Sequence, residues 1–141
     1  MQTRQATLSD SAAIADLLKS LGYPDNERFI ESRVEQQLTH PDAKLLVAVE
    51  DASVLGFVSL HFIPQVALEG DFCRISYFCV SESSRSKGVG AALEEAVTAL
   101  ARERACDRIE VHCHSTRAAA HRFYYRQGYS ASPEYLLKSL K

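Results

Sequence analysis

The stretch Cys79-Val-Ser-Glu-Ser-Ser-Arg-Ser-Lys-Gly-Val-Gly-Ala-Ala-Leu93 runs from an apolar strand, through a polar loop with two glycines, into an Ala- and Leu-rich helix. A helix that begins here leaves its first backbone N–H groups without intrahelical partners and carries partial positive charge at its start. Gly88 and Gly90 let an anion approach the backbone closely, and Arg85 and Lys87 add positive charge. The stretch therefore predicts a binding site for a phosphate or pyrophosphate.

Other phosphate-binding loops fit this stretch less well. A Walker loop needs Gly-x-x-x-x-Gly-Lys followed by Ser or Thr, which does not occur here. A dinucleotide fingerprint would place its third glycine at Leu93, and its ribose-binding acid at Glu110, about 20 residues beyond Gly90. Glu110 falls inside an expected strand, which makes that match weak. A helix start that uses glycine only for a tight turn is the structural alternative.

Length and composition are those of an ordinary globular protein. The 141 residues are 46% hydrophobic and 24% charged, with net charge -2, which predicts one domain over residues 1–141 and no nucleic-acid footprint. No apolar run approaches a membrane span, and the N-terminus lacks the apolar core of a signal peptide. We therefore expect a cytoplasmic protein. Its four cysteines form no C-x-x-C pair, so free thiols are expected.

The first half of the chain predicts an antiparallel meander with two helices. Apolar residues at helical spacing and local breakers set most of the boundaries. The expected order is a strand over residues 3–7, a helix from Ser9 or Asp10 to Leu21, a helix over 25–40, a strand over 45–49, a hairpin turn at 51–53 and a strand over 55–63.

The second half predicts a parallel strand pair around a crossover helix. A strand over residues 71–80, with Ile75, Tyr77 and Cys79 on one face, leads into a helix over 88–104 and a strand over 108–114. A helix over 117–127 ends at Gly128, and a terminal hairpin or strand pair is expected over 129–140. The fold class is therefore a mixed, mostly antiparallel α/β sheet with helices on both faces.

A second motif, Arg117-Ala-Ala-Ala-His-Arg-Phe-Tyr-Tyr-Arg-Gln-Gly-Tyr129, follows the glycine loop. Together with Arg85-x-x-Gly88-x-Gly90, it resembles the two blocks of the GNAT family of acetyltransferases, in the right order. The segments Ala-His-Arg-Phe-Tyr and Tyr-Leu-Leu-Lys-Ser-Leu-Lys are most similar to small-amine enzymes, such as aminoalkylphosphonate and aminoglycoside N-acetyltransferases. Matches in the second block are Ala120, Phe123, Tyr124, Gly128 and Tyr129.

The resemblance implies acetyl-CoA as cosubstrate, held in a V-shaped opening between the parallel strands 71–80 and 108–114. Backbone groups near the end of the first of these strands would bond the pantetheine arm, and amides of the loop would hold the pyrophosphate. Arg117 stands where many relatives have asparagine, and its guanidinium could still meet a phosphate. The implied cofactor-binding residues are Phe78, Cys79, Val80, Arg85, Ser86, Lys87, Gly88, Val89, Gly90, Ala91, Arg117 and Tyr124.

The resemblance also implies direct attack of a neutral amine on the thioester, with Tyr124 as partner of the departing thiolate. A phenol with a pKa of about 10 is protonated at neutral pH and can donate to sulfur. The structural alternative for Tyr124 is an aromatic packing residue on an amphipathic helix. Tyr125 points away on the same helix and is expected at the surface.

The general base is where the sequence departs from the family, because the strand over 71–80 has no acid between Asp71 and Glu82. His112 and His114 share a face of the expected strand over 108–114, and histidine suits a base at neutral pH. They could instead fill the sheet surface or bind a metal, although no third ligand is evident, so no metal site is expected. Water is the remaining proton acceptor. Weaker candidates near the amine are His61, His121 and Glu69.

These observations predict an enzyme that transfers the acetyl group of acetyl-CoA to a primary amine of a small molecule. A protein N-terminus or lysine is a second acceptor class, and a non-catalytic acyl-CoA sensor or partner module is the alternative function. No nucleic acid or membrane is expected as a partner. The resemblance favours a homodimer.

Overall fold

A computed structural model describes residues 1–113, 117–132 and 136–141 of the chain. The chain falls into two compact units, Met1–Glu110 and Val111–Lys141, and each is described by itself. The organisation of residues 1–141 as one domain stays a prediction.

The larger unit alternates strands and helices. Its elements are β1 (Gln2–Gln5), the 3-10 turn η1 (Leu8–Asp10), α1 (Ser11–Leu21), α2 (Ile30–Thr39), β2 (Ala43–Glu50), β3 (Ser53–Ile63), β4 (Phe72–Val80), the 3-10 turn η2 (Glu82–Ser84), α3 (Val89–Glu103) and β5 (Arg108–Val111), whose last residue belongs to the smaller unit. The smaller unit contains α4 (Ala118–Arg126).

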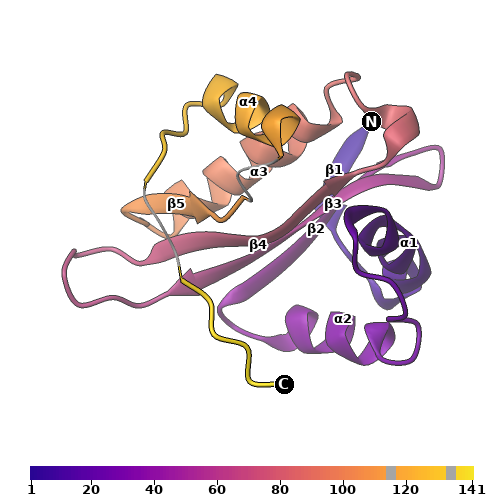
Figure 1. Ribbon diagram of the computed structural model, residues 1–141, viewed down its shortest axis with the longest axis horizontal. Helices are drawn as coiled ribbons and strands as arrows, with labels where there is room; N and C mark the ends of the chain where they lie inside the picture. Colours follow the sequence, from indigo (N-terminus) through magenta and orange to yellow (C-terminus); the bar gives the residue numbers. More distant parts are fainter. Residues whose placement is uncertain (114–116, 133–135) are drawn as a thin grey trace. The chain divides into compact units, whose positions relative to one another are not determined.

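The strands form one sheet in the order β1-β2-β3-β4-β5. The pairs β1–β2, β2–β3 and β3–β4 are antiparallel, whereas β4 and β5 run parallel across the crossover helix α3. Helices α1 and α2 lie on one face of the sheet and α3 lies on the other (Figure 1). The predicted fold class, a mixed and mostly antiparallel α/β sheet with helices on both faces, is confirmed.

Apolar stripes of the helices bury both faces of the sheet. On the first face, Ile14 and Leu17 of α1 belong to the same buried cluster as Val47 of β2 and Phe57 of β3. On the second face, α3 contributes its fully buried Leu93. These contacts bury the central strands on both faces and hold the start of α3 against the sheet, which positions the loop between β4 and α3.

Two local turns follow from their sequences as expected. Gly22 ends α1 with a left-handed φ of 107°, and its N–H reaches back to carbonyls of the last turn. Asp51 and Ala52 both have positive φ, 48° and 68°, the conformation of a two-residue turn that matches strand twist. The pairing of Glu50 with Ser53 closes this hairpin.

The prediction that Ile75, Tyr77 and Cys79 share a face of β4 was wrong. Ser59 of β3 pairs with Tyr77, but the next residue, Leu60, pairs with Ile75, so Ser76 is an extra residue in β4. Such a bulge reverses the alternation of side chains along the strand. Ile75 therefore lies on the α3 face, and Tyr77 and Cys79 lie on the α1 face.

Two element boundaries also differ from expectation. The second helix begins at Ile30 rather than at 25, because Asn26 forms a turn first: its side chain donates to the Tyr23 carbonyl, and its own carbonyl accepts from Phe29 and Ile30. The fifth strand ends at Val111 rather than at 114.

The early end of β5 falls near the bulge in its neighbour β4. The Asp107 N–H donates to the Asp71 carbonyl at 3.0 Å where the two strands begin. Glu110, near the end of β5, is ion-paired with Arg74, two residues before Ser76. A bulge bends its strand and increases the local twist, and β5 ends at this level of the sheet.

The predicted terminal hairpin was also wrong for the described residues. Neither 129–132 nor 136–141 contains a strand, and Leu136, Leu137 and Leu140 are exposed. The Ser139 hydroxyl donates to the Lys141 carbonyl at 3.0 Å, a contact within the segment, whereas a strand needs a neighbouring strand. Elsewhere the cysteines are free, as expected, and no helix within the described ranges has the length and apolar character of a membrane span.

Candidate functional site

The loop after β4 presents its backbone at the surface. Ser81 donates to the Leu55 carbonyl at 2.8 Å, and the buried Ser84 holds η2 against the unit. The following residues, 85–88, are exposed. Ser86 and Gly88 adopt left-handed φ values of 66° and 80°. Left-handed residues within a right-handed stretch turn successive backbone N–H groups toward the same side.

The start of α3 completes this concave backbone surface. Gly88 is the N-cap and makes no side-chain capping hydrogen bond, and the first intrahelical bond here runs from Ala92 to the Gly88 carbonyl at 3.0 Å. The N–H groups before Ala92 therefore point out of the helix end. Val89 is buried and anchors this end, whereas Arg85 and Lys87 are exposed on its approach. The structure thus brings the predicted residues 85–91 together in a cationic loop suited to a phosphate group.

Gly56 of β3 fixes how closely this loop approaches the sheet. A Cβ at Gly56 would lie 2.8 Å from the Cys79 carbonyl oxygen and 3.3 Å from both Val80 Cα and a methyl group of Leu93. Glycine therefore allows the end of β4 and the first turns of α3 to pack against β3 without displacement.

The three predicted residues at the end of β4 differ in what they can offer. The Cys79 thiol donates to the Leu17 carbonyl at 3.2 Å inside the core, and Cys79 pairs with Phe57 two positions along from the Ser81–Leu55 hydrogen bond. The backbone of Cys79 therefore faces β3 rather than a ligand. Phe78 and Val80 are half-buried. Backbone groups of β4 point alternately toward β3 and away from it, and β4 continues to Val80, well past the point where β5 ends.

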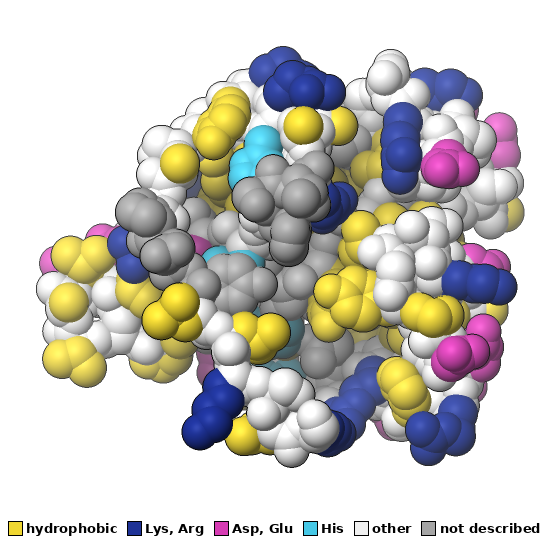
Figure 2. All heavy atoms as spheres, viewed as in Figure 1, with side chains coloured by type: hydrophobic (Ala, Val, Ile, Leu, Met, Phe, Trp, Pro, Cys, Tyr) yellow, Lys and Arg dark blue, Asp and Glu magenta, His cyan; other side chains and the backbone are white. Residues whose placement is uncertain are grey.

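The bulge in β4 creates an exposed aromatic pair on the α1 face. The rings of Tyr77 and Tyr23 meet edge to face with centroids 5.4 Å apart, although their side chains are 40% and 52% exposed. Figure 2, which colours tyrosine with the hydrophobic residues, shows such side chains at the surface beside α1. The buried Asn26 holds the Tyr23 carbonyl at 3.1 Å, and Asp25 adopts a positive φ of 63°.

A polar pair lies on the same face of the sheet. His61 Nδ1 and Ser76 Oγ are 2.8 Å apart; His61 is half-buried, and Ser76, the bulge residue, is exposed. Burial lowers the pKa of His61, and the nearby positive charge of His40 lowers it further. Sequence analysis named His61 only as a weak candidate and missed Ser76 and Tyr23, because the pairing depends on a register shift that no local pattern indicates.

Tyr124 in the smaller unit is a buried phenol. Its ring packs against Phe123 and Tyr129, with centroids 5.3 Å and 5.4 Å away, and burial raises its pKa well above the usual range of tyrosine. The charge of Arg117, the exposed N-cap of α4, partly opposes this rise. Tyr124 therefore stays protonated at any working pH. Tyr125 is 52% exposed, as expected.

The remaining candidates for the general base or the amine site lie in different surroundings. The prediction that His112 lies on a strand was wrong, because β5 ends before it and His112 is exposed. His114 lies outside the described residues. His121 is half-buried and its ring is 6.1 Å from that of Tyr125, and Glu69 is exposed on the loop between β3 and β4.

Two alternatives from the sequence can be set against the geometry. Glu110, the acid that a dinucleotide site would need, is held by Arg74 at 2.8 Å and Arg108 at 2.9 Å, so its carboxylate already has cationic partners. Among residues 1–113, 117–132 and 136–141, no three His, Cys, Asp or Glu side chains are grouped to hold a metal ion.

Comparisons with known proteins agree with the fold, and the matching family model spans both motifs. The model of the acetyltransferase (GNAT) family matches residues 12–129. A transcriptional regulator from Bacillus halodurans C-125 has a similar structure, with TM-score 0.90 and 21% identity over 99% of each chain. No curated protein matches the sequence at a significant level.

Two acetyltransferases of known structure share the fold at low sequence identity. A ribosomal-protein-alanine N-acetyltransferase from Brucella melitensis biovar Abortus 2308 has TM-score 0.80 and 21% identity, over 99% of this chain and 100% of the other. An aminoglycoside 6'-N-acetyltransferase from Acinetobacter haemolyticus has TM-score 0.84 and 16% identity, over 100% and 99%.

Proposed function

This chain belongs to the acetyltransferase (GNAT) family, and from that premise we propose that it transfers the acetyl group of acetyl-CoA to a primary amine of a small molecule. The observation that carries the proposal is the exposed loop from Arg85 to Ala91, in which left-handed Ser86 and Gly88 precede the uncapped start of α3. The backbone N–H groups that this conformation exposes, together with the cations Arg85 and Lys87, suit the pyrophosphate of CoA.

The orientation of acetyl-CoA follows from the position of this loop. Because the pyrophosphate would sit beyond the C-terminal end of β4, the pantetheine arm would run back along the strand, meeting Val80 before Phe78. Backbone groups of β4 that face away from β3 would bond the amides of the arm. The thioester would then lie closest to the bulge at Ser76 and Tyr77.

The chemistry is attack of a neutral amine on the thioester carbonyl. The new C–N bond forms, the C–S bond breaks, and its electron pair leaves on the CoA sulfur. We assign the stabilisation of that sulfur to Tyr124, as the family resemblance implies. A thiol has a pKa of about 8.5, far below that of the buried phenol, so Tyr124 would donate a hydrogen bond to the thiolate and keep its own proton.

A small-molecule amine is the proposed acceptor. The sequence motif around Tyr124 is most similar to small-amine enzymes, and Tyr23 and Tyr77 offer aromatic rings beside the bulge. The faces of such rings attract an ammonium, and their apolar surface suits the body of an amine. We also propose, from composition and from the resemblance, that the protein is cytoplasmic and forms a homodimer.

The proposal is tested by titrating CoA calorimetrically and by measuring thiol release from acetyl-CoA with a broad panel of amines. Binding of CoA together with turnover on one amine class is the expected result, and it identifies the acceptor. Binding without turnover on small amines or on peptides would favour the acyl-CoA sensor instead. Absence of CoA binding would overturn the assignment of the loop.

A further inference from the structure

We propose that Ser76 and His61 form a proton relay that takes a proton from the acceptor ammonium, with the exposed serine hydroxyl facing the amine and the histidine behind it. This inference rests on the proposed acetyl transfer and names the group that replaces the acid missing from β4. The juxtaposition of the two side chains, 2.8 Å apart across the β3–β4 pair, carries it.

The bulge places the relay where the acetyl group is expected. Ser76 is the extra residue of β4, two positions before Phe78, a separation of about 7 Å along a strand. His61 shares its face of β3 with Phe57, whose ring belongs to the core under α1. The hydroxyl therefore lies on the α1 face, where the adjacent Tyr77 contacts Tyr23, rather than on the α3 face.

The surroundings of His61 favour its neutral form. Burial and the charge of His40, at the end of α2, both lower its pKa. Its register partner on β4 is Arg74, which is itself ion-paired with Glu110 of β5. On the β2 side its partner is the uncharged Ala43, which is followed by Lys44 and preceded by Asp42. Among the described residues, the side chain of His61 is hydrogen-bonded to Ser76 and ion-paired with no carboxylate, so the imidazole is available as a proton acceptor near neutral pH.

The relay balances in protons and electrons. Ser76 Oγ–H donates to the unprotonated Nδ1 of His61, whose other nitrogen carries the ring proton. As the hydroxyl proton moves to Nδ1, the ammonium proton moves to Oγ, which leaves a neutral amine, an intact serine and an imidazolium. The amine attacks the thioester, loses its second proton to the departing sulfur, and yields the amide and CoA–SH. The imidazolium releases its proton to water.

The test compares the pH dependence of kcat/KM for wild type, His61→Gln and Ser76→Ala, on the best amine of the panel. A general base is typically worth about 10²–10⁴ in rate, so H61Q is expected to lose at least about 10²-fold in kcat/KM at pH 7. S76A should fall in the same direction without loss of folding, because Ser76 is exposed. Both should approach the wild-type rate at a pH above the pKa of the amine, where no proton needs removal. His40→Gln removes only the neighbouring charge that lowers the pKa of His61, so it should move the acid limb of the kcat/KM profile to higher pH and leave the rate on the plateau unchanged.

The outcomes separate the relay from the activity on which it rests. An active wild type, with H61Q and S76A retaining both rate and pH profile, would overturn the relay alone. Loss of activity in H61Q that persists at high pH would also overturn it, because a structural defect does not depend on protonation of the amine. A wild type that binds no CoA and acetylates no amine would overturn the proposed function and the relay together. CoA affinity within about twofold of wild type in both variants, with recovery at high pH, is the supporting result.

Discussion

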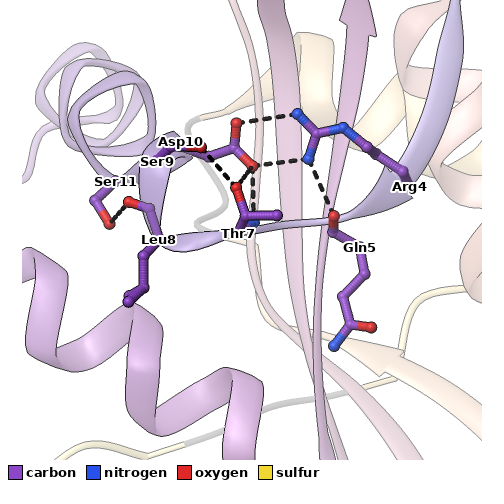
Figure 3. Close-up of polar contacts among 7 residues, drawn as sticks. All are labelled: Arg4, Gln5, Thr7, Leu8, Ser9, Asp10 and Ser11. Carbon is purple, nitrogen blue, oxygen red and sulfur yellow. Dashed lines mark hydrogen bonds and ion pairs between the residues drawn. The ribbon is translucent and has the colours of Figure 1, made fainter.

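Replacing Asp10 with alanine should destabilise the protein by removing the polar contact that joins β1 to the start of α1. Figure 3 shows the carboxylate between the Arg4 guanidinium and the backbone of Thr7. Arg4 donates to its two oxygens at 2.8 and 3.1 Å, and the Thr7 N–H donates at 2.8 Å. Asp10 is only 5% exposed, so its carboxylate depends on these protein partners rather than on water.

The size of the effect follows from these contacts. Loss of the cap to Thr7 costs about 1 kcal/mol. Loss of the charge-assisted pair adds about 1–2 kcal/mol rather than more, because the Arg4 side chain is 35% exposed and regains water. The sum of about 2–3 kcal/mol corresponds to a fall in Tm of about 5–10 °C for a chain of this size. Asp10→Asn retains an acceptor for the Thr7 N–H, so it should lose only the contribution of the charged pair with Arg4.

The effect should depend on pH with a definite sign. The hydrogen bonds from Arg4 hold the pKa of Asp10 below its usual range. A lowered folded-state pKa contributes stability that is fully present above the unfolded value, about 3.9, and that is lost as pH falls through the folded pKa. The difference between wild type and D10A should therefore be constant near neutral pH and shrink below about pH 4.

Guanidinium unfolding at pH 7, 5, 4 and 3 measures this difference. Asp16→Ala, which removes an exposed carboxylate from α1, is the control for general charge effects. A D10A penalty below about 0.5 kcal/mol at pH 7 would contradict the assigned contacts. A penalty that stays constant down to pH 3 would contradict the lowered pKa.

Three further changes address the candidate site. Gly88→Glu should weaken CoA binding at least about tenfold by calorimetry, because it puts a bulky anion at a left-handed position facing the phosphates; Gly88→Asn, neutral and tolerant of that φ, should retain most of the affinity. Tyr124→Phe should lower kcat about 10²-fold with unchanged CoA affinity, as for loss of one donor to developing negative charge, and unchanged turnover would rule out its role. Gly56→Ala should cost about 1–3 kcal/mol in chemical unfolding through its 2.8 Å contact with the Cys79 carbonyl, and a neutral result would contradict the close packing.

Local patterns in the sequence predicted much of this molecule. The glycine loop before α3, the left-handed end of α1 at Gly22 and the turn at Asp51 and Ala52 depend on residues within a few positions of one another, and the structure places them as expected. The alternation of strands and helices in the second half indicated the parallel pair, because a crossover helix allows that connection. The resemblance carried by residues 85–90 and 117–129 identified the family before any geometry was considered.

Tertiary structure decided what the sequence left open. The extra residue Ser76 is defined only by how β4 pairs with β3, because the sequence of one strand does not specify its register with a neighbour. That bulge put Ile75 and Tyr77 on opposite faces of the sheet. It also brought Ser76 to His61 and Tyr77 to Tyr23, and it lies near the end of β5. Residues that are distant in the chain meet through strand pairing and packing, so the conformation of the loop before α3 could be predicted from the sequence, whereas the side-chain pairs at the β4 bulge could not.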